Sequence, residues 1–311
     1  MLRRALLAMS ASKQVRDLIM ATPLTRDVVA RFVAGETVAD ALTATERLIS
    51  SGRLVTIDFL GEDTADPDQA AGVADEYVRL LAQLSAAGLA ARGRAEVSVK
   101  PTAVGLGLAE HGEKTALENI SRIAAAARNA GTTVTVDMED HARIEPTLRL
   151  VGELRADYPD LGCVIQSYLR RSAADCTALA FAGSRVRLCK GAYQAPDGAG
   201  LASRAEVDRS YARCMRILLE GRGYPMLATH DPRLIRIAGT KAGILGREAG
   251  SFEYQMLYGI RPAEQVRLAD AGAQVRVYLP YGSDWYGYLV RRLAERPANL
   301  AFFLRALSST R

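Results

Sequence analysis

Residues 133–168 read TVTVDMEDHARIEPTLRLVGELRADYPDLGCVIQSY, and this stretch decides the fold. Its two ends, Thr133–Asp137 and Cys163–Tyr168, are short runs bounded by turn residues and rich in β-branched side chains, a pattern that predicts strands. Between them, Arg143–Ala156 has apolar residues at a spacing of 3.6, which is typical of an amphipathic helix. A strand, a helix and a second strand in this order indicate two parallel strands joined by a crossover helix.

The same unit recurs along the chain. Further predicted strands are Leu54–Leu60, Glu96–Lys100, Arg185–Lys190, Met226–His230, Phe252–Met256 and Gln274–Leu279. Helical spacing recurs at Glu113–Ala130, Ala205–Glu220 and Tyr286–Leu307. Eight units in about 250 residues are the count and length of a (β/α)8 TIM-type barrel. A doubly wound open α/β sheet is the alternative.

The region before the first predicted strand has a different pattern. We expect residues 1–50 to form an N-terminal helical region packed on the barrel, and residues 51–311 to form the barrel. The first residues, MLRRALLAMSASKQVR, could be a transit peptide. Apolar residues Leu2, Leu6 and Met9 at helical spacing favour a first amphipathic helix instead.

Composition excludes several classes of protein. With 49% hydrophobic and 24% charged residues in a chain of 311, intrinsic disorder is excluded. No apolar run reaches about 18 residues, so no transmembrane helix is expected. A net charge of +5 without blocks of like charge gives no support for nucleic-acid binding. Four cysteines without CxxC spacing indicate thiols in a reducing compartment, and we expect a cytoplasmic protein, peripheral at most to the inner membrane face.

Most predicted strands end in a polar side chain, which an apolar core would not select. In a barrel these ends surround one face, where barrel enzymes have their active sites. We therefore expect one shared polar site, built from Lys100, Asp137, Gln166, Tyr168, Lys190, Thr229, His230, Gln255 and Tyr278. Two of the five lysines in this arginine-rich chain fall in this set, Lys100 and Lys190.

These residues leave two kinds of chemistry open. A lysine at a strand end could form a Schiff base, as in an aldolase. Lysines and arginines could instead bind an anion or a cofactor phosphate, and Gly191 after Lys190 would let a polyanion approach the backbone. The chain has only three histidines, and Asp137 is not evidently paired with one, so no metal site is expected.

The stretch YLPYGSDWYGYLVRRLAE, residues 278–295, carries a second signal. Arg291 and Arg292 diverge by about 100° on a helix and would approach a ligand from two sides. Two guanidiniums beside tyrosine rings suit a small ligand with one carboxylate and an apolar body. An amphipathic surface helix with an Arg291–Glu295 pair is the alternative interpretation.

Taken in order, several segments resemble proline dehydrogenase of the monofunctional bacterial type. They are DMED at 137–140, RLCKGAY at 187–193, FEYQMLYGI at 252–260, RVYLPYG at 276–282 and YLVRRLAE at 288–295. The resemblance implies a distorted (β/α)8 barrel preceded by N-terminal helices, with FAD at the carboxyl ends of the strands. It implies oxidation of L-proline to 1-pyrroline-5-carboxylate by hydride transfer to FAD, the first step of proline catabolism to glutamate. Electrons would pass to a quinone.

The resemblance also implies roles for particular residues. Asp137 and Arg187 would be catalytic. Asp137 would position Lys100, and Arg187 would lie beside the flavin. Substrate would be bound by Lys100, Arg291, Arg292, Tyr278, Tyr288, Leu188 and Tyr193. FAD would be bound by Met138, Gln166, Arg187, Lys190, Gly191, Ala192, Thr229 and His230. Glu295 would pair with the arginine helix as structural support.

Three departures from the family pattern concern the cofactor side. Ala195 stands where an acidic residue is common, Asp231 stands where asparagine is usual, and residues 197–203 are rich in Gly and Ala. No aldehyde dehydrogenase domain follows, so we expect a separate 1-pyrroline-5-carboxylate dehydrogenase. A flavin-dependent amine or imino-acid oxidoreductase, a Schiff-base aldolase and a non-catalytic barrel are the alternatives. The bulky Tyr278 supports proline over hydroxyproline as substrate.

Overall fold

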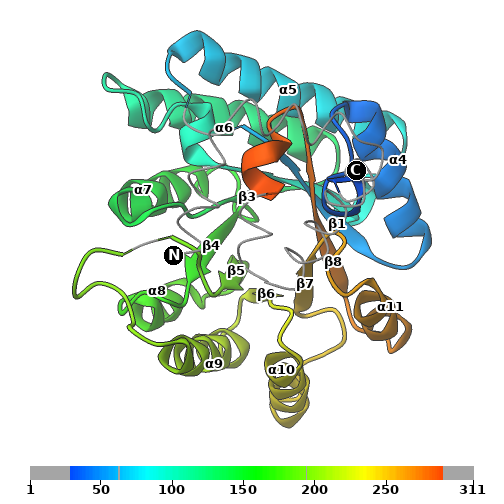
Figure 1. The fold of residues 1–311 in the computed structure, drawn as a ribbon, viewed down its shortest axis with the longest axis vertical. Coiled ribbons are helices and arrows are strands. Elements are labelled where there is room, and N and C mark those ends of the chain that lie inside the picture. Colours follow the sequence, from blue (N-terminus) through cyan, green and yellow to red (C-terminus); the bar gives the residue numbers. More distant parts are fainter. Residues whose placement is uncertain (1–28, 62–63, 194, 290–311) are drawn as a thin grey trace, which may run out of the picture.

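A computed structural model describes residues 29–61, 64–193 and 195–289 of the chain. Its centre is a closed barrel in which each strand pairs in parallel with the next and β8 pairs with β1 (Figure 1). The (β/α)8 prediction is thereby confirmed, and the open-sheet alternative is wrong. The strands are β1 Leu54–Phe59, β2 Ala95–Val99, β3 Val134–Val136, β4 Gly162–Gln166, β5 Arg185–Cys189, β6 Tyr224–Ala228, β7 Glu253–Leu257 and β8 Val275–Tyr281.

Helices surround the barrel on the outside (Figure 1). They are α4 Val38–Ser50, α5 Pro67–Ala86, α6 Gly112–Asn129, α7 Ile144–Leu154, α8 Ser172–Leu179, α9 Arg204–Glu220, α10 Pro232–Ile244 and α11 Pro262–Asp270. Short 3-10 turns lie at Ala91–Gly93, Pro101–Val104 and His141–Arg143. Helix α4 packs beside β1 and β8. The predicted domain division near residue 50 stays a prediction, because residues 1–28 lie outside the described part.

Local sequence explains where several helices begin. Thr37 and Asp40 form a capping box at α4, and Ser203 and Glu206 form one at α9. Helices α5 and α10 begin with an aspartate cap followed by proline, whose fixed φ suits the first turn. These caps satisfy backbone N–H groups that the helix itself leaves unpaired.

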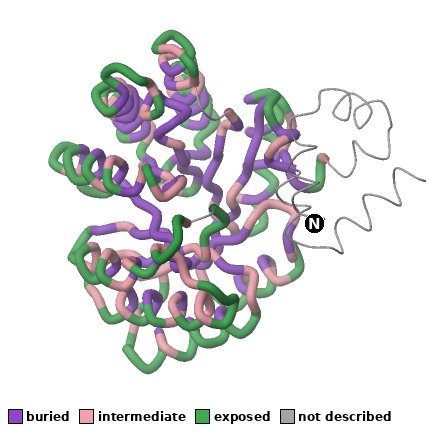
Figure 2. The backbone as a smooth tube through the Cα atoms, turned by 60° about the vertical axis from the view of Figure 1, so that its left-hand side comes forward, coloured by how far each residue is buried: buried purple, intermediate pink, exposed green. Residues whose placement is uncertain are grey.

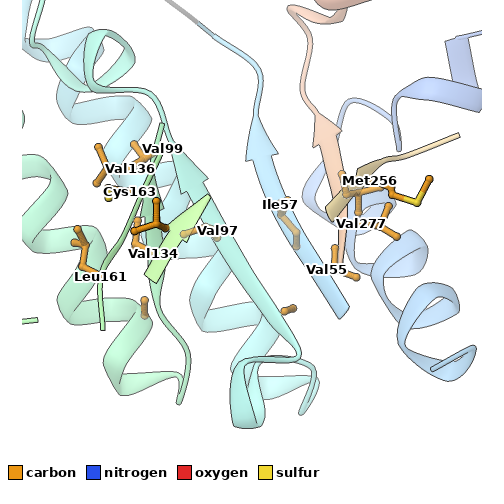
Figure 3. Close-up of a cluster of buried hydrophobic side chains, with 14 of the residues drawn as sticks. Val55, Ile57, Val97, Val99, Val134, Val136, Leu161, Cys163, Met256 and Val277 are labelled. Carbon is orange, nitrogen blue, oxygen red and sulfur yellow. The ribbon is translucent and has the colours of Figure 1, made fainter. Parts of the chain in front are cut away.

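Alternate residues of each strand face the helices and form the main core. Val55, Ile57, Val97, Val99, Val134, Val136, Leu161, Cys163, Met256 and Val277 belong to this layer (Figure 3). Burial is concentrated in the strands, and exposed residues lie on the outer helices and loops (Figure 2). Because successive side chains of a strand point to opposite faces, the residues between these apolar ones face the barrel interior. That inner set is strongly polar.

Four strands end one or two residues earlier than predicted. Strands β2, β3, β5 and β6 end at Val99, Val136, Cys189 and Ala228, so Lys100, Asp137, Lys190 and Thr229 follow them directly. At β2 the reason is the proline after Lys100, which begins a 3-10 turn. These residues therefore belong to the loops at the carboxyl face of the barrel.

Candidate active site

Asp137, Arg187 and Tyr278 meet at the carboxyl end of the barrel. Nη1 of Arg187, on β5, donates to Oδ1 of Asp137 at 2.5 Å. The Tyr278 hydroxyl, on β8, donates to Oδ2 of the same carboxylate at 2.8 Å. The Arg187 guanidinium also lies 5.1 Å from the centre of the Tyr278 ring. Three residues on or directly after separate strands, all singled out in the sequence, thus form one cluster.

Burial and charge fix the protonation of this cluster. Burial is the largest single effect and would lower the pKa of Arg187, but the surrounding acidic groups, Asp137 first among them, together outweigh burial and raise the pKa. Burial, reinforced by the Asp137 charge, raises the pKa of Tyr278 well above its usual value. The arginine therefore stays charged and the tyrosine stays a hydrogen-bond donor.

The other hydrogen bonds of Arg187 leave one of its nitrogens without a partner among the described residues. Its Nε donates to Oε1 of Gln255 at 2.6 Å, and Nη1 also donates to Oγ of Ser98 at 2.8 Å. A guanidinium has five N–H donors, and these bonds use the three on Nε and Nη1. Nη2 is buried and has no hydrogen-bond partner within the described residues. Buried donors are rarely left unpaired, so Nη2 marks a place for an acceptor from a ligand.

Lys100 is held by a residue that the sequence interpretation passed over. Its Nζ lies 2.7 Å from both carboxylate oxygens of Asp58, on β1. We expected Asp137 to position Lys100; the structure gives that task to Asp58, while Asp137 bonds Arg187 and Tyr278. A signal was present in the sequence, because Asp58 interrupts the apolar run LVTIDFL.

Lys190 lies in a charged cluster between α9 and α10. Its Nζ is 2.5 Å from Oδ1 of Asp208 and 3.6 Å from Oδ2 of Asp231. Arg233 pairs with the same two aspartates at 3.0 and 2.8 Å. Hydrogen bonds from Arg233, with the Lys190 charge, hold the pKa of Asp231 well below its usual range. Asp208 could not be found from the sequence, because an aspartate in an amphipathic helix is usually a solvated side chain.

Gln166 and Gly191 line the adjoining part of the carboxyl face. Nε2 of Gln166 donates to the backbone oxygens of Met138 and Glu139 at 3.2 and 2.7 Å. Gly191 has φ of +92°, and a Cβ there would lie 2.3 Å from Cδ1 of Tyr168. Only glycine fits this close approach.

Thr229 and His230 tie the loop after β6. The Thr229 hydroxyl accepts from the Asp231 backbone N–H at 3.1 Å. Nε2 of His230 accepts from the Leu257 N–H at 2.9 Å, so that nitrogen carries no proton. These bonds hold the end of β6 against the end of β7.

The expected substrate wall is only partly assembled by the described residues. Leu188 is fully buried in the cluster between barrel and helices, on the side of β5 away from Arg187, so the structure does not bring it to the site. Tyr288 is buried, whereas Tyr193 is 40% exposed. Arg291, Arg292 and Glu295 lie outside the described residues.

Among the described residues, no group of three or more His, Cys, Asp or Glu side chains could hold a metal ion. Among the same residues, no helix is long and apolar enough to cross a membrane.

Comparison with known proteins agrees with this geometry. The family model described as proline dehydrogenase matches residues 41–305. Proline dehydrogenase of Deinococcus radiodurans is 39% identical, covering 98% of this chain and 97% of that protein. Proline dehydrogenase 1 of Bacillus subtilis strain 168 is 37% identical, with 99% of each chain covered.

A solved structure shares the fold. Proline utilization A from Bdellovibrio bacteriovorus, inactivated by N-propargylglycine, superposes with a TM-score of 0.78 at 26% identity. The match covers 86% of this chain and 32% of that longer one. The family match over most of the chain and the full-length relatives together show that this chain belongs to the proline dehydrogenase family.

Proposed function

We propose that this protein oxidises L-proline to 1-pyrroline-5-carboxylate with FAD as the cofactor. As a member of its family, the chain is an oxidoreductase acting on proline. The single observation that carries the finer proposal is the Arg187–Asp137–Tyr278 cluster, in which a buried arginine keeps one nitrogen without an acceptor among the described residues.

The residues at the carboxyl face fit FAD. The free Nη2 of Arg187 offers a donor to the flavin, and the partly exposed Lys190 offers a cation to a phosphate. Met138, Gln166, Gly191, Ala192, Thr229 and His230 would complete the binding site. FAD, when bound, supplies an acceptor for a hydride. Arg187 would supply a charged donor beside it from a side chain that is itself shielded from water.

The charges of the site argue for arginines beyond the described residues. Lys100 is neutralised by Asp58, and Arg187 by Asp137. The carboxylate of a bound proline would therefore meet two cations that are already paired, and a carboxylate removed from water needs charged donors of its own. Arg291 and Arg292 would supply the positive charge, with Lys100 as a further donor to the carboxylate. Glu295 would pair with this arginine segment.

Aromatic rings would bind the apolar part of proline. Tyr278 is fixed by its bond to Asp137 and presents a rigid ring at the end of β8. Tyr288 and Tyr193 would extend this wall. Asp137 has both oxygens engaged, which suits a residue that positions Arg187 and Tyr278.

The same contacts weigh against a Schiff-base aldolase. A Schiff-base lysine needs its amine free to attack the substrate, whereas Nζ of Lys100 and Nζ of Lys190 are each engaged by a carboxylate. We further propose that electrons pass from FAD to a quinone, and that a separate 1-pyrroline-5-carboxylate dehydrogenase uses the product. The cytoplasm, with peripheral attachment to the membrane, is the proposed location.

The test is the visible spectrum of the purified protein. We expect a flavin spectrum that bleaches on anaerobic addition of L-proline and returns on addition of a quinone. D-proline serves as the control substrate. A colourless protein that cannot be reconstituted with FAD would overturn the proposal, as would a flavin that proline does not reduce.

A further inference from the structure

Ion pairs occupy the barrel interior beneath Arg187. Glu253 on β7 pairs with Arg276 on β8 at 2.8 Å, and Glu96 on β2 pairs with Arg185 on β5 at 2.7 Å. Both glutamates are fully buried. Branched apolar residues usually fill the interior of such a barrel. Burying these charged side chains instead costs free energy, and we therefore expect the polar layer to have a function.

Glu253 is ionised in this layer. Burial alone would raise its pKa, but the charges of Arg276 and Arg185 outweigh burial and lower it. An ionised carboxylate can only accept hydrogen bonds. Oε1 of Glu253 accepts from Arg276 and also from Nε2 of Gln255, the latter at 2.6 Å.

The amide of Gln255 consequently has one orientation. Its NH2 group must face the carboxylate of Glu253, which leaves Oε1 facing Nε of Arg187 at 2.6 Å. A guanidinium only donates, so the reversed amide would set donor against donor at one end and acceptor against acceptor at the other. The Gln255 side chain is buried, at 3% exposure.

This amide completes the frame that holds Arg187. Gln255 binds Nε, and Ser98 with Asp137 binds Nη1. A planar group held on both these nitrogens cannot rotate, so the position of Nη2 is set. We propose that Gln255, oriented by Glu253, is the positioning residue that aims Nη2 of Arg187 at the bound flavin.

This inference rests on the proposed function and adds a residue pair that acts through Arg187. It predicts that loss of the Gln255 amide affects the flavin and the chemical step more than proline binding. In Gln255→Met the side chain keeps its volume but Nε of Arg187 loses its acceptor. We expect kcat to fall by about 10²-fold, the order expected for a misplaced group. KM for proline should change less than about 3-fold, and the flavin reduction potential should fall because the cation is no longer held beside it.

A matched control is available in Asn119 on α6. Its amide donates to the Val104 backbone oxygen and accepts from Arg122, so it also bridges an oxygen and an arginine, but outside the barrel. Asn119→Leu should lower the Tm and leave kcat and the flavin potential as in the wild type.

A charge swap separates positioning from simple packing. Gln255→Glu places a second carboxylate against that of Glu253, and the two negative charges repel each other. Adding Glu253→Gln removes this repulsion. The new amide would donate to the carboxylate at position 255 and accept from the Tyr224 hydroxyl, giving up the contact with Arg276, while that carboxylate accepts from Nε of Arg187. The double variant should turn over at least about tenfold faster than Gln255→Glu. It remains informative even if Gln255→Met does not fold.

The experiments distinguish failure of the proposed function from failure of the inference about Gln255. A wild-type protein without reducible flavin overturns the proposed function itself. The inference alone fails in either of two cases with active wild type: Gln255→Met keeps wild-type kcat and flavin potential, or the double variant is no faster than Gln255→Glu. Lowered kcat and potential in Gln255→Met, with recovery in the double variant, support it.

Discussion

Nζ of Lys100 lies 2.7 Å from each carboxylate oxygen of Asp58, so the lysine that follows β2 is ion-paired with a residue of the neighbouring strand β1. Asp58 is 1% exposed at its side chain and Lys100 is 11% exposed. A pair this buried has each charge stabilised by the other, and its two members cannot be altered independently.

Removal of Lys100 alone is therefore expected to destabilise the protein. Lys100→Met leaves the Asp58 carboxylate buried without this partner, at a cost of about 3 kcal/mol in the free energy of unfolding. The double variant Lys100→Met/Asp58→Leu should recover most of that loss. Urea unfolding of the three proteins measures it, and a double variant less stable than Lys100→Met contradicts the pairing.

Substitution of either proposed carboxylate-binding arginine should weaken proline binding. Arg291→Met or Arg292→Met removes a charge-assisted contact of about 1.5–3 kcal/mol, which corresponds to roughly a 10- to 100-fold rise in KM for proline. FAD content, measured by absorbance, should stay at the wild-type level. Unchanged proline kinetics in both variants would show that the carboxylate is bound elsewhere.

Asp231 offers a way to tighten cofactor binding. Its carboxylate lies 3.6 Å from Lys190 and, under the proposed function, would compete with an FAD phosphate for that cation. Asp231→Asn removes the charge but keeps the side-chain oxygen that caps α10 through the Arg233 N–H. We expect a lower Kd for FAD, measured by quenching of flavin fluorescence on titration of the apoprotein.

The control for Asp231 is Asp231→Ala, which loses both the charge and the cap. It should unfold more easily than Asp231→Asn, by about 1 kcal/mol. An FAD Kd that rises in Asp231→Asn would mean that the aspartate binds the cofactor instead of competing with it.

Glu253 should make stability depend on acid. Burial opposes its charge but Arg276 and Arg185 prevail, so its folded pKa lies below the usual 4.5. Its contribution to stability is full above about pH 4.5 and is lost as the pH falls through the lower, folded pKa. The unfolding free energy of Glu253→Gln should therefore decline less between pH 5 and pH 3 than that of the wild type. Parallel declines would contradict a lowered pKa.

The sequence by itself determined the architecture and showed that polar residues gather at one face of the barrel. Alternating strand and helix periods, such as residues 133–168, repeat eight times, and that repetition is compatible with few folds other than a closed barrel. The polar ends of these strands, Asp137, Lys100 and Tyr278 among them, had to gather at one face because all strands run parallel.

Only the tertiary structure decided which residues pair. Asp58 holds Lys100, Asp137 holds Arg187, and Asp208 holds Lys190, and none of these partners follows from spacing along the chain. Leu188 was expected at the substrate and lies instead in the outer core, because one step along a strand reverses the face of a side chain. Strand periodicity tells which residues share a face. Barrel closure and strand stagger decide how far apart their charged atoms lie, and ionic contacts depend on those distances.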